Sequence, residues 1–125
     1  MNAKHYVSLE VAKMLKEINH DGLNYAMHIG NNGFICPSYV VGCNVYPCPT
    51  ILEAMDWLEK RDVRIEIRIN MVYGKECKFT YYFAIYQGYD FCPIFESDNY
   101  YEIMYHDRYE CMNAAIKKGI ELLKV

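Results

Sequence analysis

The sequence predicts an α+β fold in which an antiparallel sheet of four or five strands carries three helices, packed mainly on one face. Two helix starts are marked by an oxygen cap with a glutamate three residues later, Thr50 with Glu53 and Asp107 with Glu110. Between them, apolar and polar residues alternate, as in a half-buried strand. The 125 residues, of which 53% are hydrophobic, are enough for one domain, 1–125, with its own core.

The first helix is expected to begin after Ser8, whose hydroxyl can accept an amide of the first turn, and to end at Asp21-Gly22. Its apolar residues recur at helical spacing: Val7, Val11, Met14, Leu15 and Ile18. A hairpin should follow, with strands from Tyr25 to Ile29 and from Phe34 to Cys36. The intervening Gly-Asn-Asn-Gly supplies residues that accept the positive φ angles of a tight turn.

The segment Pro37–Pro49 gives a weak signal. Tyr39 to Val41 could form a short strand, and Pro47 and Pro49 favour an extended approach to the second helix. That helix begins after Thr50, and a stripe of four residues should be buried, with Trp57 on its flank: Ile51, Ala54, Met55 and Leu58.

Two long strands are predicted next, joined by a turn through Gly74. In the first, Val63, Ile65, Ile67 and Ile69 alternate with charged residues, and the second runs from Lys78 to Tyr86. The alternation predicts one set against the helices: Ile65, Ile67, Phe79, Tyr81 and Phe83. It places another set on the outer face: Arg64, Arg68, Tyr82 and Tyr86.

The segment Gln87–Asp107 contains acidic residues and tyrosines but no lysine or arginine. We interpret Asp90–Asn99 as a solvated loop and Tyr100–Tyr105 as a candidate last strand. The final helix has a clear pattern, because five apolar residues recur in steps of three and four: Tyr109, Met112, Ile116, Ile120 and Leu123. The expected order is therefore helix, two strands, helix, two or three strands, helix.

The charge balance, 16 acidic against 13 basic residues, gives a net charge of −3 and no bulk attraction for nucleic acid or anionic lipid. Charged residues among the first twenty argue against a secretory signal. The stretch Gly22–Leu52 has no charged residue, but its glycines, prolines and asparagines are incompatible with one continuous membrane helix. We therefore expect a cytoplasmic location and no membrane partner.

The cysteine spacing favours reduced thiols over a disulfide framework or a zinc site. The closest pair is Cys43 and Cys48, Cys36 precedes them, and His28 is the nearest imidazole. Zinc sites usually show two close pairs, and a disulfide framework needs an oxidising compartment. We expect no metal and no cofactor.

Three stretches carry a resemblance to known proteins: the opening Val-Ser-Leu-Glu-Val-Ala-Lys-Met-Leu-Lys-Glu from Val7, the run from Cys48 to Lys60 followed by Ile-Glu-Ile, and the closing run from Tyr109 to Leu123. They resemble small proteins of gut bacteria and their phages or mobile elements. The resemblance implies a shared fold and a mobile-element setting. It implies no catalytic residue, because that group has no assigned activity.

The predicted function is a small non-enzymatic accessory or interaction protein that binds a protein partner or a second copy of itself. Arginines beside tyrosines on an outer strand face are enriched at interface centres, so the candidate surface is Arg64, Arg68, Tyr82 and Tyr86. The same pairing also occurs as ordinary cross-strand packing.

Two alternatives are less favoured. The order from Thr50 to Val125 resembles a double-stranded-RNA-binding domain, which would make the chain an RNA- or DNA-associated module. However, the last helix begins Asp-Arg-Tyr-Glu, which would repel phosphate. An enzyme could combine Cys48, His28 or His106, and Glu53, but no nucleophile motif or phosphate loop accompanies them. We expect no small-molecule substrate.

Overall fold

The computed structural model describes residues 3–18, 20–37, 45–72, 78–89, 91–97 and 105–123, without the side chains of residues 71, 72 and 78. Its elements are η1 (Ala3–His5), α1 (Leu9–Glu17), β1 (Met27–Gly30), β2 (Ile35–Pro37), β3 (Val45–Pro47), α2 (Ile51–Lys60), β4 (Arg64–Val72), β5 (Lys78–Tyr86), β6 (Phe95–Glu96) and α3 (Arg108–Leu123). The α+β class is confirmed, but its strands form two antiparallel sheets, ordered β2-β1-β3 and β4-β5-β6.

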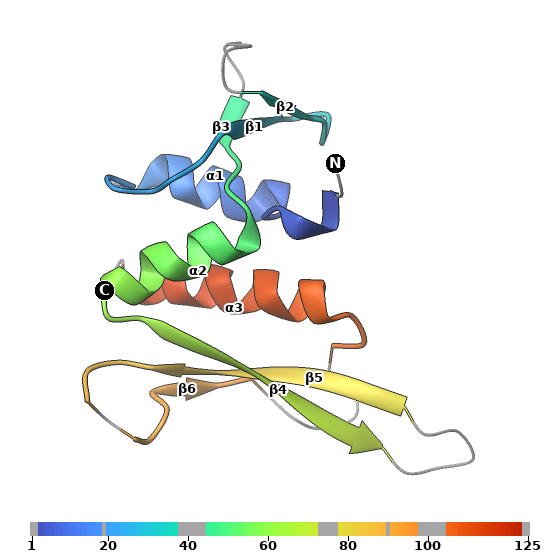
Figure 1. The fold of residues 1–125 in the computed structure, drawn as a ribbon, viewed down its shortest axis with the longest axis vertical. Coiled ribbons are helices and arrows are strands. Elements are labelled where there is room, and N and C mark those ends of the chain that lie inside the picture. Colours follow the sequence, from blue (N-terminus) through green and yellow to red (C-terminus); the bar gives the residue numbers. More distant parts are fainter. Residues whose placement is uncertain are drawn as a thin grey trace.

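The helices lie between the two sheets (Figure 1). From top to bottom, the small sheet β2-β1-β3 is followed by α1, then by α2 and α3 side by side, and then by the large sheet β4-β5-β6. Helix α1 contacts both the small sheet and α3, and α3 contacts β4 and β5. Each sheet therefore buries one face against the helical layer.

The prediction of one sheet of four or five strands was wrong. Strand β1 has β2 on one side. On its other side it pairs with β3 and not with a long strand, with His28 opposite Pro47. Alternation identifies a strand and its buried face but does not identify the strand it pairs with. In this fold both sheets pack their apolar faces against helices, and the helices separate the two sheets.

The core joins all three helices to the large sheet. Its largest fully buried side chains include Leu15 of α1, Leu58 of α2, Ile85 of β5, and Ile116 and Ile120 of α3. Trp57, expected on the flank of α2, is buried. Its indole Nε1 donates to the carbonyl of Asp21 at 3.0 Å, which satisfies its one polar atom.

The caps of α1 and α2 are confirmed. The Ser8 hydroxyl accepts the Val11 amide, and Thr50 and Glu53 form the reciprocal capping box, with bonds of 3.1 and 2.9 Å. Helix α1, however, ends at Glu17, four residues before the predicted stop.

The start of α3 is capped differently from the prediction. Asp107 Oδ1 accepts the Tyr109 amide at 2.7 Å, one residue before the glutamate that was expected to complete a capping box. A short aspartate side chain can satisfy a nearby amide in this way without a second partner.

Strand β6 lies inside Asp90–Asn99, which was predicted to be a loop. It is two residues long and pairs with β5, where the Ile94 and Ser97 amides donate to the carbonyls of Ile85 and Phe83, each at 2.8 Å. The candidate strand Tyr100–Tyr105 falls mostly outside the described residues, and Tyr105 alone forms a bridge to Tyr81. The candidate strand Tyr39–Val41 also falls outside the described residues.

Candidate functional site

The four candidate residues share one face of the large sheet. The register of β4 and β5 puts Arg64 opposite Tyr86 and Arg68 opposite Tyr82. Helix α3 covers the other face, and no helix or strand among the described residues lies over this one (Figure 1). We call this surface, made by Arg64, Glu66, Arg68, Tyr82, Tyr86 and Glu96, the outer face.

The opposite face is only partly as predicted. Phe83 is buried, and Ile65, Ile67 and Tyr81 are half-buried against the core. Phe79, which was also expected against the helices, is 54% exposed, and Ile69 of β4 is 64% exposed. The end of the β4–β5 hairpin farthest from β6 extends past the start of α3 (Figure 1).

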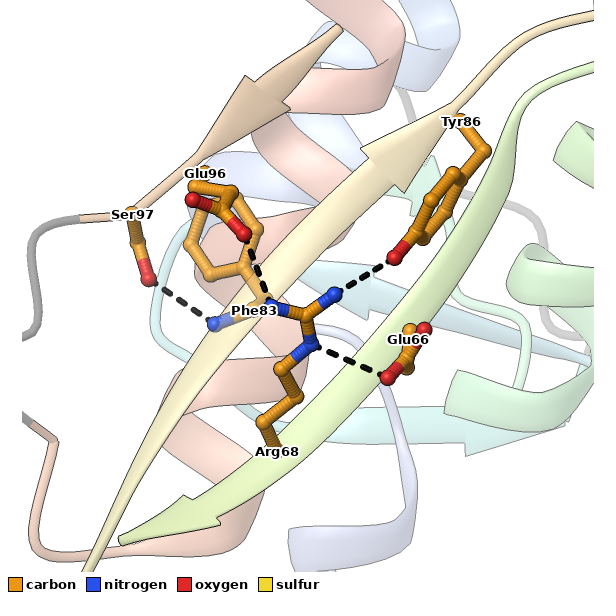
Figure 2. A network of polar contacts seen from close by, with 6 residues as sticks. All are labelled: Glu66, Arg68, Phe83, Tyr86, Glu96 and Ser97. Carbon is orange, nitrogen blue, oxygen red and sulfur yellow. Dashed lines mark hydrogen bonds and ion pairs between the residues drawn. The ribbon is translucent and has the colours of Figure 1, made fainter. Parts of the chain in front are cut away.

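Arg68 is the centre of the outer face (Figure 2). Its guanidinium donates to Glu66 at 2.9 Å, to Glu96 at 2.7 Å and to the Tyr86 hydroxyl at 2.5 Å. The same guanidinium lies 5.7 Å from the centre of the Tyr82 ring, within the range of a cation–π contact. One side chain therefore links all three strands of the sheet, and the planar arginine fork suits this multiple donation.

The electrostatics of this cluster favour its charged form. The hydrogen bond from Arg68 is the main cause that lowers the pKa of Glu66 below its ordinary value, and the same bond raises the pKa of Arg68. The cluster of Arg68, Glu66 and Glu96 contains two carboxylates and one guanidinium, so its net charge is negative. Phosphate would meet repulsion from Glu66 and Glu96 at this point.

Arg64 connects the outer face to the segment that follows β5. Its guanidinium donates to the carbonyl of Gly88, and the Gly88 amide donates to Asp62 at 2.8 Å. These bonds hold Gly88 just after β5, and nearby Tyr89 and Phe91 are each 98% exposed. A hollow of about 580 Å³ lies among Arg64, Tyr86 and these two aromatic rings.

Sequence reasoning missed Glu66, Glu96, Tyr89 and Phe91 as parts of this surface. Glu66 lies between Arg64 and Arg68 in the alternation of β4. The same pattern that placed the two arginines on the outer face therefore also predicts Glu66 there. Glu96 and the exposed aromatics depend on β6 folding back onto β5, and no periodicity marks a strand of two residues.

Two residues of the enzymatic alternative, Cys48 and Glu53, are held in other contacts. The Cys48 thiol is buried and lies 3.6 Å from the Val7 carbonyl, and burial raises its pKa to about 12. A thiol in this state is a poor nucleophile at neutral pH. The Glu53 carboxylate caps α2, and His106 lies exposed just before α3.

His28 lies opposite Cys36 in the small sheet, and its Nδ1 atom is buried without a hydrogen-bond partner. Cys36, Cys48, Cys92 and Cys111 are free thiols, and Cys43 and Cys77 fall outside the described residues. Within the described ranges, no group of three or more histidine, cysteine, aspartate or glutamate side chains could hold a metal ion.

A cavity of about 770 Å³ lies between the N-terminal segment with α1 and helix α3. Lys117 and Glu10 form an ion pair of 2.6 Å across it, and the Asn113 side chain accepts the Ser8 amide at 2.7 Å. These contacts join segments about a hundred residues apart in the chain. The N-terminal segment and α1 are therefore joined to α3 around this cavity by an ion pair and a hydrogen bond.

No protein-family model, curated protein or solved structure matches the chain. The resemblance to small proteins of gut bacteria and mobile elements stays a prediction. None of the helices in the described part of the chain combines the length and apolar character needed to span a membrane.

Proposed function

We propose that this chain is a non-enzymatic interaction module whose protein partner docks on the outer face of the large sheet. The observation that carries the proposal is the Arg68 cluster. It holds Tyr82 and Tyr86 beside an arginine on a sheet face that no described helix or strand covers. Tyrosine and arginine are the residue types that dominate binding energy at interface centres.

The surroundings of the cluster support a protein partner over nucleic acid. Glu66 and Glu96 together more than offset the charge of Arg68. The fully exposed rings of Tyr89 and Phe91 extend the surface at one side. Fully exposed aromatic rings next to a polar cluster suit a partner with an apolar centre. Half-exposed carboxylates suit basic residues around that centre.

The fixed geometry also favours binding. Side chains held by hydrogen bonds before binding lose less conformational entropy when a partner docks. Arg68 is held by three acceptors, and two of them, Glu96 and Tyr86, belong to different strands. The hydrogen bond from Arg68 therefore holds the Tyr86 ring in place before a partner binds.

The test is quantitative capture of partners from the host with the wild-type chain and with the double variant Tyr82→Ala, Tyr86→Ala. We expect the double variant to keep its circular dichroism spectrum and to lose the captured partner. Phe34→Ala is the matched control, because it removes an exposed ring, 69% accessible, from the distant β1–β2 hairpin. Equal capture by the wild-type chain and the folded double variant would contradict the proposal.

A further inference from the structure

Strand β4 is an edge strand of nine residues. The sheet order is β4-β5-β6, so β5 covers one edge of β4, and no described strand pairs with the other. An edge this long is a template for pairing with another chain unless it is blocked. No proline interrupts Arg64–Val72, so each outward amide of the strand can donate to another strand.

The backbone groups at this edge can be assigned. Along a strand, the amide and carbonyl of each residue point to one side, and the side alternates from residue to residue. Three residues of β5 direct carbonyls or amides toward β6 and Tyr105, away from β4: Tyr81, Phe83 and Ile85. Their neighbours in β5 therefore bond to Arg64, Glu66 and Arg68. Three residues of β4 consequently point their amides and carbonyls to the free edge: Ile65, Ile67 and Ile69.

We propose that two copies of this chain pair antiparallel through these β4 edges, with the two-fold axis at Ile67. In that register Ile67 bonds to Ile67 of the second copy, and Ile65 bonds to Ile69. All three outward-facing residues then exchange hydrogen bonds. The two sheets become one continuous sheet of six strands.

Charge favours this register over the two adjacent ones. With the axis at Ile67, Glu66 of each copy lies opposite Arg68 of the other, and Arg64 lies opposite Asn70. These are the non-hydrogen-bonded pairs, in which side chains approach most closely. A shift of the axis by one residue puts Glu66 opposite Glu66, or Arg68 opposite Arg68. Like charges directly opposite are destabilising, so the neighbouring registers are disfavoured.

The side chains on the helix-facing side of β4 also favour the register with its axis at Ile67. Ile69 is 64% exposed in the single chain. Pairing about Ile67 brings it beside the half-buried Ile65 of the second copy. An apolar side chain that the helices leave exposed thus gains an apolar neighbour, twice per dimer.

This inference goes beyond the proposed function, because it concerns the edge of the sheet and names a second copy as the occupant. The outer faces of the two copies would lie side by side on the continuous sheet. Docking of a partner on the outer face does not require the dimer.

The experiment is sedimentation equilibrium from low micromolar to near-millimolar concentration. We expect the wild-type chain to approach twice its mass of 14.8 kDa as concentration rises. Ile69→Pro removes an outward amide and no bond to β5, so it should leave the chain folded and monomeric. Ile69→Val, which keeps the amide and the branched side chain, is its matched control and should still dimerise.

Two charge variants test the register. Glu66→Lys alone and Arg68→Glu alone each put like charges opposite one another at both pairs, so the dissociation constant should rise about tenfold or more. An equimolar mixture of the two variants should form the mixed dimer. There, the introduced lysine faces the introduced glutamate, and the native arginine faces the native glutamate.

A wild-type chain that stays monomeric over the whole range would overturn the inference. So would a dimer that Ile69→Pro does not weaken, or a mixture that associates no better than its components. Tyr82→Ala with Tyr86→Ala should leave the dimer intact. Loss of partner capture in that variant and loss of dimer in Ile69→Pro are therefore separate results for separate proposals.

Discussion

Arg68 of β4 reaches across β5 to Glu96 of β6 and donates a hydrogen bond of 2.7 Å. This contact joins the first and last strands of the sheet over the intervening Tyr82 and Ala84 positions (Figure 2). Strand β6 has only two residues, so a side-chain link of this kind adds to a short backbone ladder. The outer face is thus held together by polar contacts, while the inner face is held by apolar packing.

The first prediction concerns the protonation of Glu66. Its pKa is lowered in the folded chain mainly by the hydrogen bond from Arg68. Stability from this pair is therefore present above the ordinary value of 4.5 and is lost as pH falls through the lower folded value. NMR titration of the side-chain carboxyl carbon should show a midpoint below 4.5.

Arg68→Met should move that midpoint up toward the ordinary value. Arg64→Met is the matched control, because Arg64 donates to the Gly88 carbonyl and not to Glu66. A midpoint that does not respond to Arg68→Met would show that the ion pair is not formed in solution.

The second prediction concerns thiol reactivity. Cys92 is exposed, whereas Cys48 and Cys111 are buried, and burial raises the pKa of each buried thiol to about 12. Compared with the ordinary value of 9.0, this lowers the thiolate fraction about a thousandfold at neutral pH. Cys92 should react rapidly with a thiol reagent, and the two buried cysteines only after unfolding.

Peptide mapping after a short exposure would identify the labelled cysteine, and Cys92→Ser should remove its label. Rapid labelling of Cys48 in the folded chain would contradict the buried placement. Elemental analysis of the purified protein should find no zinc, and all six cysteines should titrate in denaturant without reductant.

Local signals were the part of the fold that the sequence predicted well. The caps at Ser8 and Thr50 and the hairpin around Gly33 depend on residues within a few positions of one another. Gly33, with φ of 82°, takes the positive φ angle that the turn requires. The alternation in β4 and β5 also placed the arginines and tyrosines on one face correctly.

The pairing of strands that are distant in the chain could not be predicted from the sequence. Whether β1 pairs with β3 or with a long strand depends on how α1 and α3 pack, which no short pattern encodes. For the same reason Glu96 was missed, because its place beside Arg68 depends on β6 returning to β5. The candidate surface was therefore predicted without the carboxylates that neutralise it.

The third prediction concerns the capping box of α2. Thr50→Ala should cost about 1 kcal/mol in the free energy of unfolding, because the Glu53 amide loses its acceptor. Chemical denaturation measures the change. Glu53→Gln should retain most of the box, since an amide oxygen can still accept the Thr50 amide, whereas Glu53→Ala should not. A Thr50→Ala chain as stable as wild type would show that the cap contributes little.

The fourth prediction concerns Gly119 of α3, which packs against Leu58 of α2 and Val63. A Cβ atom at this position would lie 3.1 Å from Leu58 Cδ1 and 3.2 Å from Val63 Cγ1, and both neighbours are fully buried. In Gly119→Ala, the gain of about 1 kcal/mol in helix propensity opposes the strain of moving these side chains. We expect its free energy of unfolding to stay within about 0.5 kcal/mol of wild type.

Gly119→Val adds two further methyl groups to the same tight contact and should lose about 2–3 kcal/mol in denaturant unfolding. Ala114→Val on the same helix is the matched control, because Ala114 borders the large cavity and the added methyls have room there. Leu58→Ala should reduce the cost of Gly119→Val by opening space where the two side chains meet, which a double-mutant cycle measures. Equal losses for Gly119→Val and Ala114→Val, without coupling to Leu58, would show that the valine acts through helix propensity and that α3 does not pack closely against α2 at this point.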